Sequence, residues 1–327
     1  MAYSAQIVRR ARQLLEQKKA DAQSRYQQRL QQAYTQAPRL KEIDLELRRS
    51  MTLAAQAVFA GGGDAAAAME EVKKANLSLQ EERKALLAQQ FAPDYLDETP
   101  VCDNCGGSGY VGSAMCGCLA ALCRQEQKKE LAQLSSGEER FEKFRLDYYP
   151  EKVDRTFGAS PRTIMELTLK NCRQYAKDFG AGSGNLLFVG GTGLGKTFLS
   201  ACIANAVTDC GFSVAYESAP NLFAKLEKNR FNPDEQSKLD IQNFMDCDLL
   251  IVDDLGTELP GNFVTAAMYS LVNDRLLAGK SMIISTNLNI DEITKRYSPQ
   301  IASRLQGNFK GLTFVGEDIR VLKNRGL

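Results

Sequence analysis

The sequence predicts an α/β protein with a doubly wound, five-stranded parallel sheet, preceded by a helical N-terminal region with a small cysteine-rich module. Three observations support this fold class. Residues 1–98 are rich in Ala, Gln, Arg, Lys and Leu, and their apolar residues recur every three or four positions. Four cysteines lie within the 17 residues 102–118. From residue 185 onward, five apolar strand-like segments alternate with helical patterns, as in parallel sheets.

Three helices are expected in residues 1–98. Pro38 interrupts the first apolar run, and the glycine-rich residues 61–64 separate a second helix from a third that begins near Ala65. Up to Arg49 the chain holds 11 Lys or Arg against 5 Asp or Glu. This basic excess is either an ordinary solvated helical face or a docking surface for a protein partner or a nucleic-acid backbone.

The cysteine cluster follows the pattern C-x₂-C-x₁₀-C-x-C and consists of Cys102, Cys105, Cys116 and Cys118. This count and spacing are typical of a tetrahedral site with four thiolate ligands, and glycines between the cysteines supply tight turns. Because every ligand is a protein sulfur, we predict a closed, structural Zn²⁺ site. An iron–sulfur cluster and unmetallated thiols are the alternatives. The other five cysteines are expected to be small, buried apolar residues.

The remaining elements complete a three-part organisation. A charged helix is expected from Ala120 to about Leu134, and residues 135–137 are expected to form a joint. We predict a helical region for partner docking (1–98), the cysteine module with its following helix (99–135) and an α/β domain (136–327). The expected strands are residues 185–190, 213–218, 248–254, 281–286 and 312–316, and a further helix is expected over residues 291–306.

A phosphate-binding loop follows the first expected strand. Residues 190–197 match G-x-x-x-x-G-K-[ST] at each fixed position and open a helix, which is the context that this motif requires. Glycines let backbone N–H groups surround the phosphates, and the helix N-terminus adds partial positive charge. Lys196 should reach the β- and γ-phosphates and the Thr197 hydroxyl should bind Mg²⁺; a glycine loop with a coincidental Lys-Thr is the alternative. The expected nucleotide-contacting residues are Gly190, Gly191, Thr192, Gly193, Leu194, Gly195, Lys196, Thr197 and Phe198.

Two carboxylates end the strand expected at residues 248–254. Buried strands rarely end in paired acids unless a positive or reactive group lies nearby. We predict that Asp253 holds Mg²⁺ through water and that Asp254 orients or deprotonates the attacking water. The chain has no histidine, so Asp254 is the best candidate base. One metal ligand beside one solvated turn residue is the alternative.

Two further polar residues are candidates for the same chemistry. Asn287 follows the strand at 281–286, where its amide would contact the γ-phosphate and the attacking water or, alternatively, would cap a turn. Arg304 lies in the helix expected at 291–306. It is either a surface cation or an arginine finger that reaches the γ-phosphate bound by a neighbouring subunit.

Composition excludes several classes of function. Lys and Arg (41) nearly balance Asp and Glu (40) in the 327 residues, so no whole-molecule field favours nucleic acid or membrane. The absence of histidine removes Ser-His-Asp and Cys-His catalysis together. No apolar run approaches the roughly 20 residues that span a bilayer. The first residues lack the apolar core of a signal peptide, and we expect a cytoplasmic protein.

The motifs of residues 141–327 resemble those of the AAA+ branch of P-loop ATPases, and within it the bacterial DnaC/DnaI helicase-loader family. They are GGTGLGKTFLSACIANA, LLIVDDLGTE, IISTNL, IASRL and GEDIR. The first is generic to P-loop proteins. The Asp-Asp-Leu-Gly ending and the Ser-Arg-Leu sequence narrow the resemblance to helicase loaders and the related IstB-type transposition ATPases.

The resemblance implies a role for individual residues. Most AAA+ ATPases carry Glu at the position of Asp254. Because the aspartate side chain is shorter and lies further from the attacking water, the resemblance implies slow ATP hydrolysis, which suits a switch rather than a motor. Only 11 residues follow Gly316, so no C-terminal helical lid is expected. The implied roles are nucleotide and Mg²⁺ binding for Lys196 and Thr197, Walker B for Asp253 and Asp254, sensor 1 for Asn287, trans-acting finger for Arg304 and possible sensor 2 for Arg320.

The resemblance also implies a function. The protein would be a loader that places a hexameric replicative DNA helicase on single-stranded DNA during DNA replication, with ATP and ADP as the assembly and release states. It would form a homo-oligomer through ATP-bridged interfaces, and its zinc module would belong to the helicase-contacting N-terminal part. The alternatives are an IstB-like transposition helper ATPase acting on duplex DNA and a nucleotide-bound adaptor without turnover.

Overall fold

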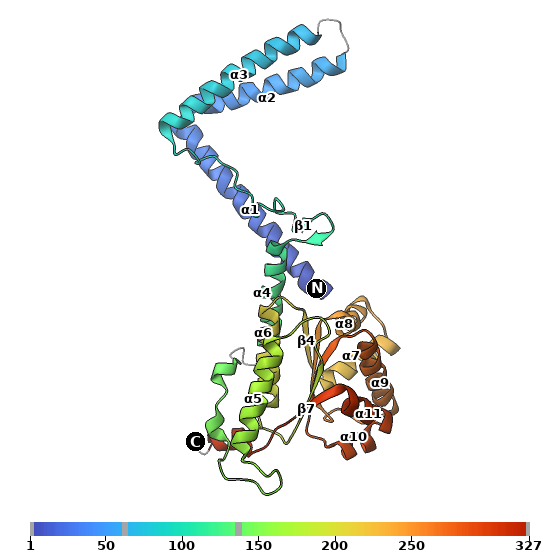
Figure 1. Cartoon of the computed structure of the whole chain (residues 1–327). Helices are drawn as coiled ribbons and strands as arrows, with labels where there is room; N and C mark the ends of the chain where they lie inside the picture. Colours follow the sequence, from blue (N-terminus) through green and yellow to red (C-terminus); the bar gives the residue numbers. More distant parts are fainter. Residues whose placement is uncertain (1–2, 61–64, 135–138, 325–327) are drawn as a thin grey trace. The chain divides into compact units, whose positions relative to one another are not determined.

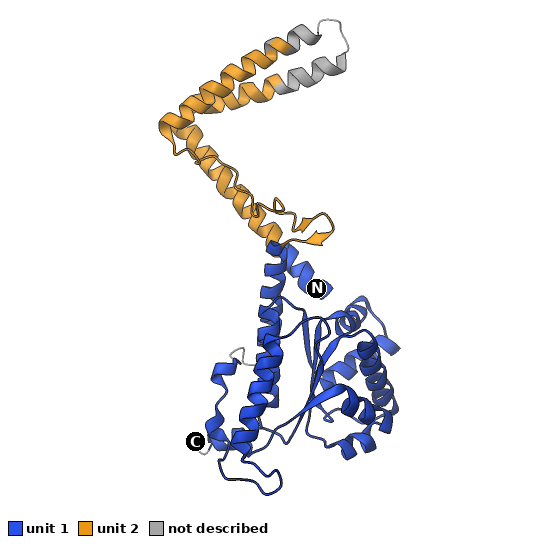
Figure 2. Ribbon diagram, viewed as in Figure 1, with its two compact units in different colours: residues 1–13, 117–327 blue, residues 14–116 orange. Residues whose placement is uncertain are grey.

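The computed structural model describes residues 3–60, 65–134 and 139–324. Two compact units divide the chain, one formed by residues 1–13 and 117–327 and the other by residues 14–116 (Figure 2). The predicted break at 61–64 and the predicted joint at 135–137 lie outside the described residues. The three-part organisation with boundaries at 98 and 135 stays a prediction. No helix in the described part of the chain is both long and apolar enough to cross a membrane.

The unit of residues 14–116 is mainly helical. It contains most of α1 (Ala5–Gln36), then α2 (Pro38–Ala60) and α3 (Ala65–Gln90), which pack side by side as a hairpin (Figure 1). The break at Pro38 is confirmed, since proline cannot continue a helix but fits the first turn of the next one. The buried residues at this corner are Ala33, Ala37 and Leu40, against which Tyr34, Leu87, Phe91, Tyr95 and Leu96 pack.

Part of the predicted basic excess is neutralised within this hairpin. The Arg39 guanidinium donates to both Glu82 carboxylate oxygens, at 2.8 and 3.1 Å. Asp44 accepts from Arg83 Nε at 2.7 Å and from the Tyr34 hydroxyl at 2.8 Å. These pairs join α2 to α3 and to the end of α1. Exposed ion pairs of this kind stabilise by at most about 1 kcal/mol each, so the apolar corner determines the packing.

The other unit contains the predicted five-stranded sheet. All its pairings are parallel, in the order β4-β5-β6-β3-β7. The strands are β3 (Asn185–Val189), β4 (Val214–Ser218), β5 (Leu249–Leu255), β6 (Ser281–Thr286) and β7 (Phe309–Thr313). The fold class is confirmed: helices cover both faces of a five-stranded parallel sheet, as in a doubly wound α/β protein.

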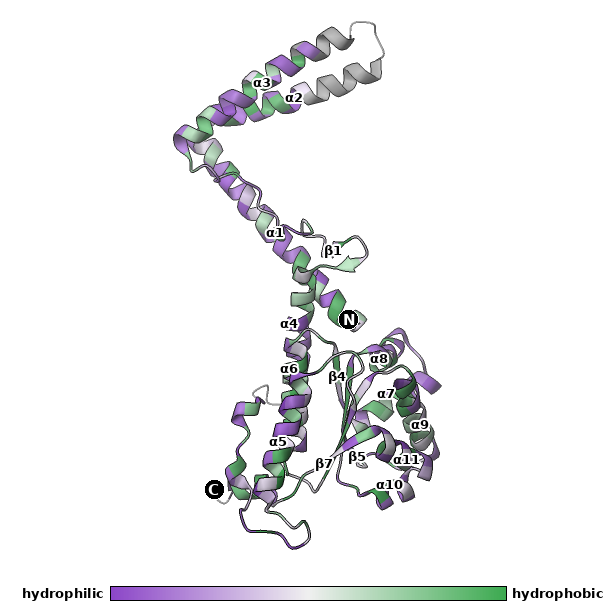
Figure 3. Ribbon diagram, viewed as in Figure 1, coloured by the Kyte–Doolittle hydropathy of each residue, from purple (hydrophilic) through white to green (hydrophobic). Residues whose placement is uncertain are grey.

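Two apolar layers enclose this sheet (Figure 1). Figure 3 shows hydrophobic residues gathered along the strands and the helices around them, whereas α1 and the coloured parts of α2 and α3 carry more hydrophilic residues. On one face lie α4 (Gly117–Leu134), α5 (Pro161–Lys177) and α6 (Lys196–Asp209). On the other face lie α7 (Ala219–Phe231), α8 (Glu235–Asp246), α9 (Asn262–Leu277), α10 (Ile290–Arg296) and α11 (Pro299–Asn308).

Two predicted elements were wrong in their bounds. The helix expected over residues 291–306 is two helices, because Pro299 cannot continue α10 and instead begins α11. Ser298 caps α11 by accepting from the Ile301 N–H at 3.3 Å. The strand expected at 312–316 is β7, which begins at Phe309. It is an edge strand whose Lys310 and Gly311 are exposed, so its polar first half does not resemble a buried strand.

Candidate functional site

The loop at residues 190–195 joins β3 to α6, as the motif requires. Gly193 has a left-handed backbone with φ of 72°. A Cβ atom at this position would lie 1.9 Å from Asp318 Oδ1, so a side chain there would have to displace the Asp318 carboxylate in addition to adopting a strained backbone. The Ile319 N–H also donates to the Gly193 carbonyl at 3.0 Å. The segment after β7 therefore lies directly on the phosphate-binding loop.

A cavity of about 390 Å³ opens over this loop. Residues 192–198 line one part of it, and Asp254 and Arg320 line another. Arg320 belongs to the short helix α12 (Ile319–Asn324). The structure thus brings together most of the residues that the sequence predicts for nucleotide binding. Its cationic, glycine-lined loop at a helix N-terminus suits an anionic phosphate chain.

Lys196 lies buried at the first position of α6. Its ammonium donates to the carbonyl oxygens of Gly190 at 2.7 Å and Gly191 at 2.6 Å. Burial lowers the pKa of Lys196, whereas the charges of Asp254 and Asp253 act in the opposite direction. The loop therefore holds a positive charge beside the cavity, where phosphate oxygens can compete with the two carbonyls for it.

Asp253 is buried at the end of β5 and is held by hydroxyls from both neighbouring strands. The Tyr216 hydroxyl on β4 donates to one carboxylate oxygen at 2.9 Å, and the Ser285 hydroxyl on β6 donates to the other. Burial, followed by the charge of Asp253, raises the pKa of Tyr216, so this phenol stays a donor. The two hydroxyls fix the orientation of a carboxylate that is suited to a hard cation such as Mg²⁺.

Asp254 is oriented differently from its neighbour. It is the one non-glycine residue with a left-handed backbone, φ 55°, in the part of the chain that the structure describes. The β5–β6 register shifts between Val252 and Leu255, and the Asp254 N–H donates to Ser285 Oγ at 2.9 Å. Such a conformation costs on the order of 1–3 kcal/mol and is often found at functional sites. It turns the carboxyl group towards the cavity.

The electrostatic surroundings of Asp254 favour proton acceptance. Burial, followed by the charge of Asp253, raises the pKa of Asp254, whereas Lys196 and Arg320 oppose the rise. A carboxylate with a raised pKa is a better general base near neutral pH. The neighbouring acids therefore differ in geometry: Asp253 faces the hydroxyls of the sheet, and Asp254 lines the cavity.

The remaining predicted residues lie in two places. Asn287 is exposed directly after β6, at the same carboxyl edge of the sheet as the two acids. Arg304 is on α11 and does not line the cavity. Its guanidinium instead lies over the ring of Tyr269 on α9, 4.3 Å from the ring centre. The structure therefore gathers the loop, Asp254 and Arg320 around one cavity and leaves Arg304 on a separate surface.

Sequence reasoning missed an aromatic segment that covers the cavity. Phe144 and Tyr148 line it, and the buried Tyr149 hydroxyl donates to the Leu194 carbonyl at 2.9 Å. The Phe144 ring packs against Tyr149 and Phe198, with ring centres 5.8 and 5.9 Å apart. The dense aromatic sequence that precedes α5 could have indicated this cover, since aromatic rings suit the flat face of a base. Tyr216 and Ser285 were missed as well.

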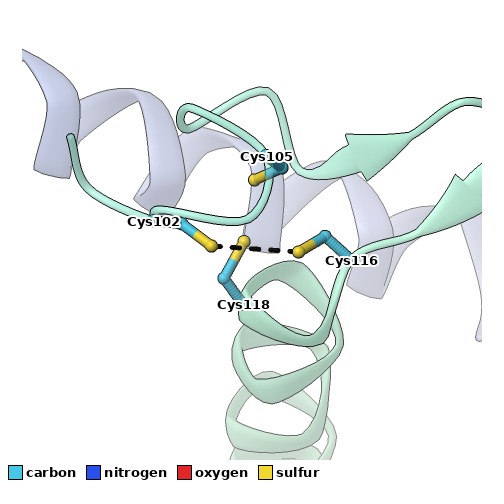
Figure 4. Close-up of side chains that lie close together, drawn as sticks. All are labelled: Cys102, Cys105, Cys116 and Cys118. Atoms are coloured by element: carbon cyan, nitrogen blue, oxygen red, sulfur yellow. Dashed lines mark hydrogen bonds between the residues drawn. The ribbon is translucent and has the colours of Figure 1, made fainter.

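The four clustered cysteines point towards one another (Figure 4). Their sulfur atoms lie within 4.8 Å of one another, and the Cys102 and Cys116 sulfurs are 3.8 Å apart. Zn–S bonds of about 2.3 Å in a tetrahedron place sulfurs about 3.8 Å apart, so the residues fit this ion. The Gly109 N–H lies 3.3 Å from Cys105 Sγ, and Asn104 Nδ2 lies 3.5 Å from Cys116 Sγ. Such N–H donors favour thiolates.

The other cysteines are not part of this cluster. Four of them are buried, as expected, and burial raises the pKa of Cys123 to about 11 and that of Cys172 to about 12. Groups with such pKa values remain neutral thiols. The prediction was wrong for Cys210, which is exposed because it directly follows the end of α6.

Comparisons with known proteins give the family of the chain. Residues 123–303, more than half of the chain, match the family model described as IstB-like ATP binding protein. The replicative helicase loader DnaC of Escherichia coli (strain K12) is 26% identical over 156 residues, covering 46% of this chain and 62% of the loader. DnaC of Buchnera aphidicola is 24% identical over 152 residues, 45% of this chain and 61% of that protein. The chain thus spans about three fifths of these relatives.

Solved structures were also compared with the chain. The crystal structure of the DnaC helicase loader aligns with a TM-score of 0.44 and 20% identity, covering 54% of this chain and 98% of that one. The crystal structure of DnaI aligns with a TM-score of 0.42 and 19% identity, covering 52% of this chain and 92% of that one.

Proposed function

The chain belongs to the IstB-like ATP-binding protein family. From this membership and from its similarity to replicative helicase loaders, we propose that it is an ATP-switched loader of a replicative DNA helicase. The observation that carries the nucleotide part is the cavity in which the phosphate-binding loop, Asp254 and Arg320 converge. The loader part is supported by the likeness of residues in this region to replicative helicase loaders. The nucleotide would be ATP, exchanged for ADP after hydrolysis.

In this proposal each residue at or beside the cavity has one task. Lys196 leaves the two loop carbonyls to bind the β- and γ-phosphates, and the Thr197 hydroxyl and Asp253 hold Mg²⁺, which neutralises developing phosphate charge. Asp254 orients the attacking water and accepts its proton, and Asn287 contacts the γ-phosphate from the next strand. Arg320 adds a second cation near the phosphates. Because aspartate is shorter than glutamate, hydrolysis is slow, as suits a switch.

Arg304 would act in a neighbouring subunit. It lies away from its own cavity, so it meets a γ-phosphate only across an interface between copies of the chain. ATP bound between subunits would then assemble them into a ring or helix, with single-stranded DNA along the inner face. Release of phosphate would loosen the assembly.

The Arg304→Ala variant is expected to bind ATP with unchanged affinity and to hydrolyse it at least about tenfold more slowly, because arginine fingers act only on transition-state charge. Nucleotide titration and phosphate release measure the two effects separately. The Asp254→Ala variant lacks the base but retains Arg304, whereas the Arg304→Ala variant retains the base. When the two are mixed, an Arg304→Ala subunit can supply the nucleotide site and an Asp254→Ala neighbour can supply the arginine, so hydrolysis should be restored at such interfaces. Wild-type turnover by Arg304→Ala alone would contradict the intersubunit site.

The N-terminal part would contact the helicase. An open groove of about 1200 Å³ in residues 14–116 is lined by the cations Lys18, Lys19, Arg25 and Arg29 and by the acids Asp21 and Glu98. Because the cations outnumber the acids, the groove suits an acidic partner surface. The four cysteines would hold a structural Zn²⁺ that fixes the adjacent loop.

A second candidate is a transposition helper that acts on duplex DNA, which the description of the matching family favours. Native mass spectrometry of the full chain with its host's replicative helicase, with and without ATP and single-stranded DNA, separates the two. A defined complex that Arg25→Glu weakens, and that Lys73→Glu on α3 does not, supports the loader. No complex, with ATP-dependent binding to duplex DNA, supports the helper.

A further inference from the structure

The side chain of Arg304 is ordered by two residues of a different helix. Its guanidinium carbon lies 4.3 Å from the centre of the Tyr269 ring. Its Nη2 group donates to the Tyr269 hydroxyl at 2.6 Å and to the Asn273 side-chain oxygen at 3.2 Å. Tyr269 and Asn273 are one turn apart on α9, so both face the same side of that helix. The guanidinium of Arg304 therefore lies over one aromatic ring, and both hydrogen bonds to α9 come from its Nη2 group.

This arrangement leaves the other edge of the guanidinium accessible. Nη1 makes one long hydrogen bond of 3.4 Å to the Gln300 carbonyl, whereas the other two hydrogen bonds of the guanidinium both come from Nη2 and go to α9. Tyr269 is 37% exposed, so the arginine is ordered at the surface rather than buried. A planar guanidinium can present two parallel N–H groups to a phosphate from its free edge.

In the proposed assembly, the group that the accessible edge of Arg304 meets is a phosphate in the nucleotide cavity of a second copy of this chain. Arg304 is half-buried on α11 and does not line its own cavity, so it can reach such a phosphate only in a neighbouring copy.

We propose that Tyr269 and Asn273 are the positioning residues of Arg304, which they hold ready to enter a neighbour's nucleotide site. This inference rests on the proposed role of Arg304 as a finger acting between subunits. A free arginine loses rotamer freedom when it is fixed on a phosphate. Because Tyr269 and Asn273 already restrict the rotamers of Arg304 within its own subunit, the interface loses less side-chain entropy when it forms.

Hybrid assemblies test this inference, because they separate the subunit that supplies the finger from the one that supplies the site. The reference mixture combines Asp254→Ala, which retains Arg304, with Arg304→Ala, which retains the base. Tyr269→Ala is then added to one partner at a time. In the Asp254→Ala partner it is expected to lower the restored hydrolysis about tenfold, through loss of a charged hydrogen bond and a ring contact. In the Arg304→Ala partner it is expected to change nothing.

Two graded variants and one control accompany the test. Tyr269→Phe keeps the ring and loses the hydroxyl, so about a threefold loss is expected in the finger-supplying partner. Asn273→Ala should give a similar loss. Asn308→Ala is the matched control, since Asn308 donates to the main-chain carbonyl of Arg304 at 3.1 Å and does not touch its guanidinium. Thermal unfolding of each variant confirms that it is folded.

The outcomes distinguish the inference from the function on which it rests. The positioning role would be wrong if Tyr269→Ala lowered the restored hydrolysis equally in either partner, or did not lower it in the partner that supplies Arg304. Either result would leave the role of Arg304 as a finger unaffected. If the reference mixture restores no hydrolysis although mixed assemblies form, the intersubunit finger itself is wrong and the positioning role fails with it. A loss confined to the finger-supplying partner supports both.

Discussion

Lys196→Ala is expected to abolish nucleotide binding and turnover. The substitution removes the buried ammonium that lies on the phosphate-binding loop, and with it the donor to the Gly190 and Gly191 carbonyls. Alanine keeps the helix propensity of α6, so the fold has no other reason to change. Titration with a fluorescent ATP analogue and an assay of phosphate release measure both losses.

The control for this variant is Lys177→Ala, which removes an exposed lysine from the end of α5. It should bind and hydrolyse ATP as the unaltered chain does, because Lys177 does not line the cavity. Retained turnover in Lys196→Ala would remove the basis for assigning the cavity to a nucleotide. Thermal unfolding curves of the two variants show whether any loss is due to misfolding.

Cys102→Ser is expected to have the second-largest effect, on metal content and local order. The unaltered chain should bind about one zinc ion, since its four sulfurs are spaced as a tetrahedral site requires. Structural zinc sites of this kind supply about 10–16 kcal/mol of apparent binding energy, which is also folding energy for the surrounding loop. The variant should lose zinc, measured by metal analysis, and residues 99–116 should become susceptible to protease.

Cys210→Ser is the matched control, because Cys210 is the exposed cysteine outside the cluster. It should leave metal content unchanged. Zinc binding by the unaltered chain should weaken as pH falls, since the thiols must lose protons to bind the ion. Zinc-free protein with a fully ordered cysteine segment would contradict the structural site.

The sequence predicts best what depends on local spacing. The loop at residues 190–197 and the acids that end β5 are recognisable because strand, glycines and helix follow one another directly. The cysteine cluster is predictable for the same reason, since its ligands lie within 17 residues. The prediction of one helix over residues 291–306 was wrong because Pro299, a local signal in the sequence, begins a new helix there.

What could not be predicted depends on partners that are distant in sequence. Tyr216 and Ser285 hold Asp253 only because the sheet order places β4 and β6 on either side of β5. The partners of Arg304 on α9 are 35 and 31 residues away. The left-handed backbone of Asp254 arises from a shift in strand register, which leaves no trace in a composition or a motif.

The close approach of Asp318 to Gly193 constrains how this chain can change over evolutionary time. The phosphate-binding motif leaves position 193 unspecified, so a comparison of motifs alone would treat a mutation there as neutral. In this fold the space that a side chain would need is occupied by the Asp318 carboxylate. A larger residue at 193 would have to displace this carboxylate and would also adopt the strained left-handed backbone of Gly193. Loss of Asp318 would remove the first of these two barriers, so mutations at position 193 should be tolerated better in sequences that lack an acid at 318.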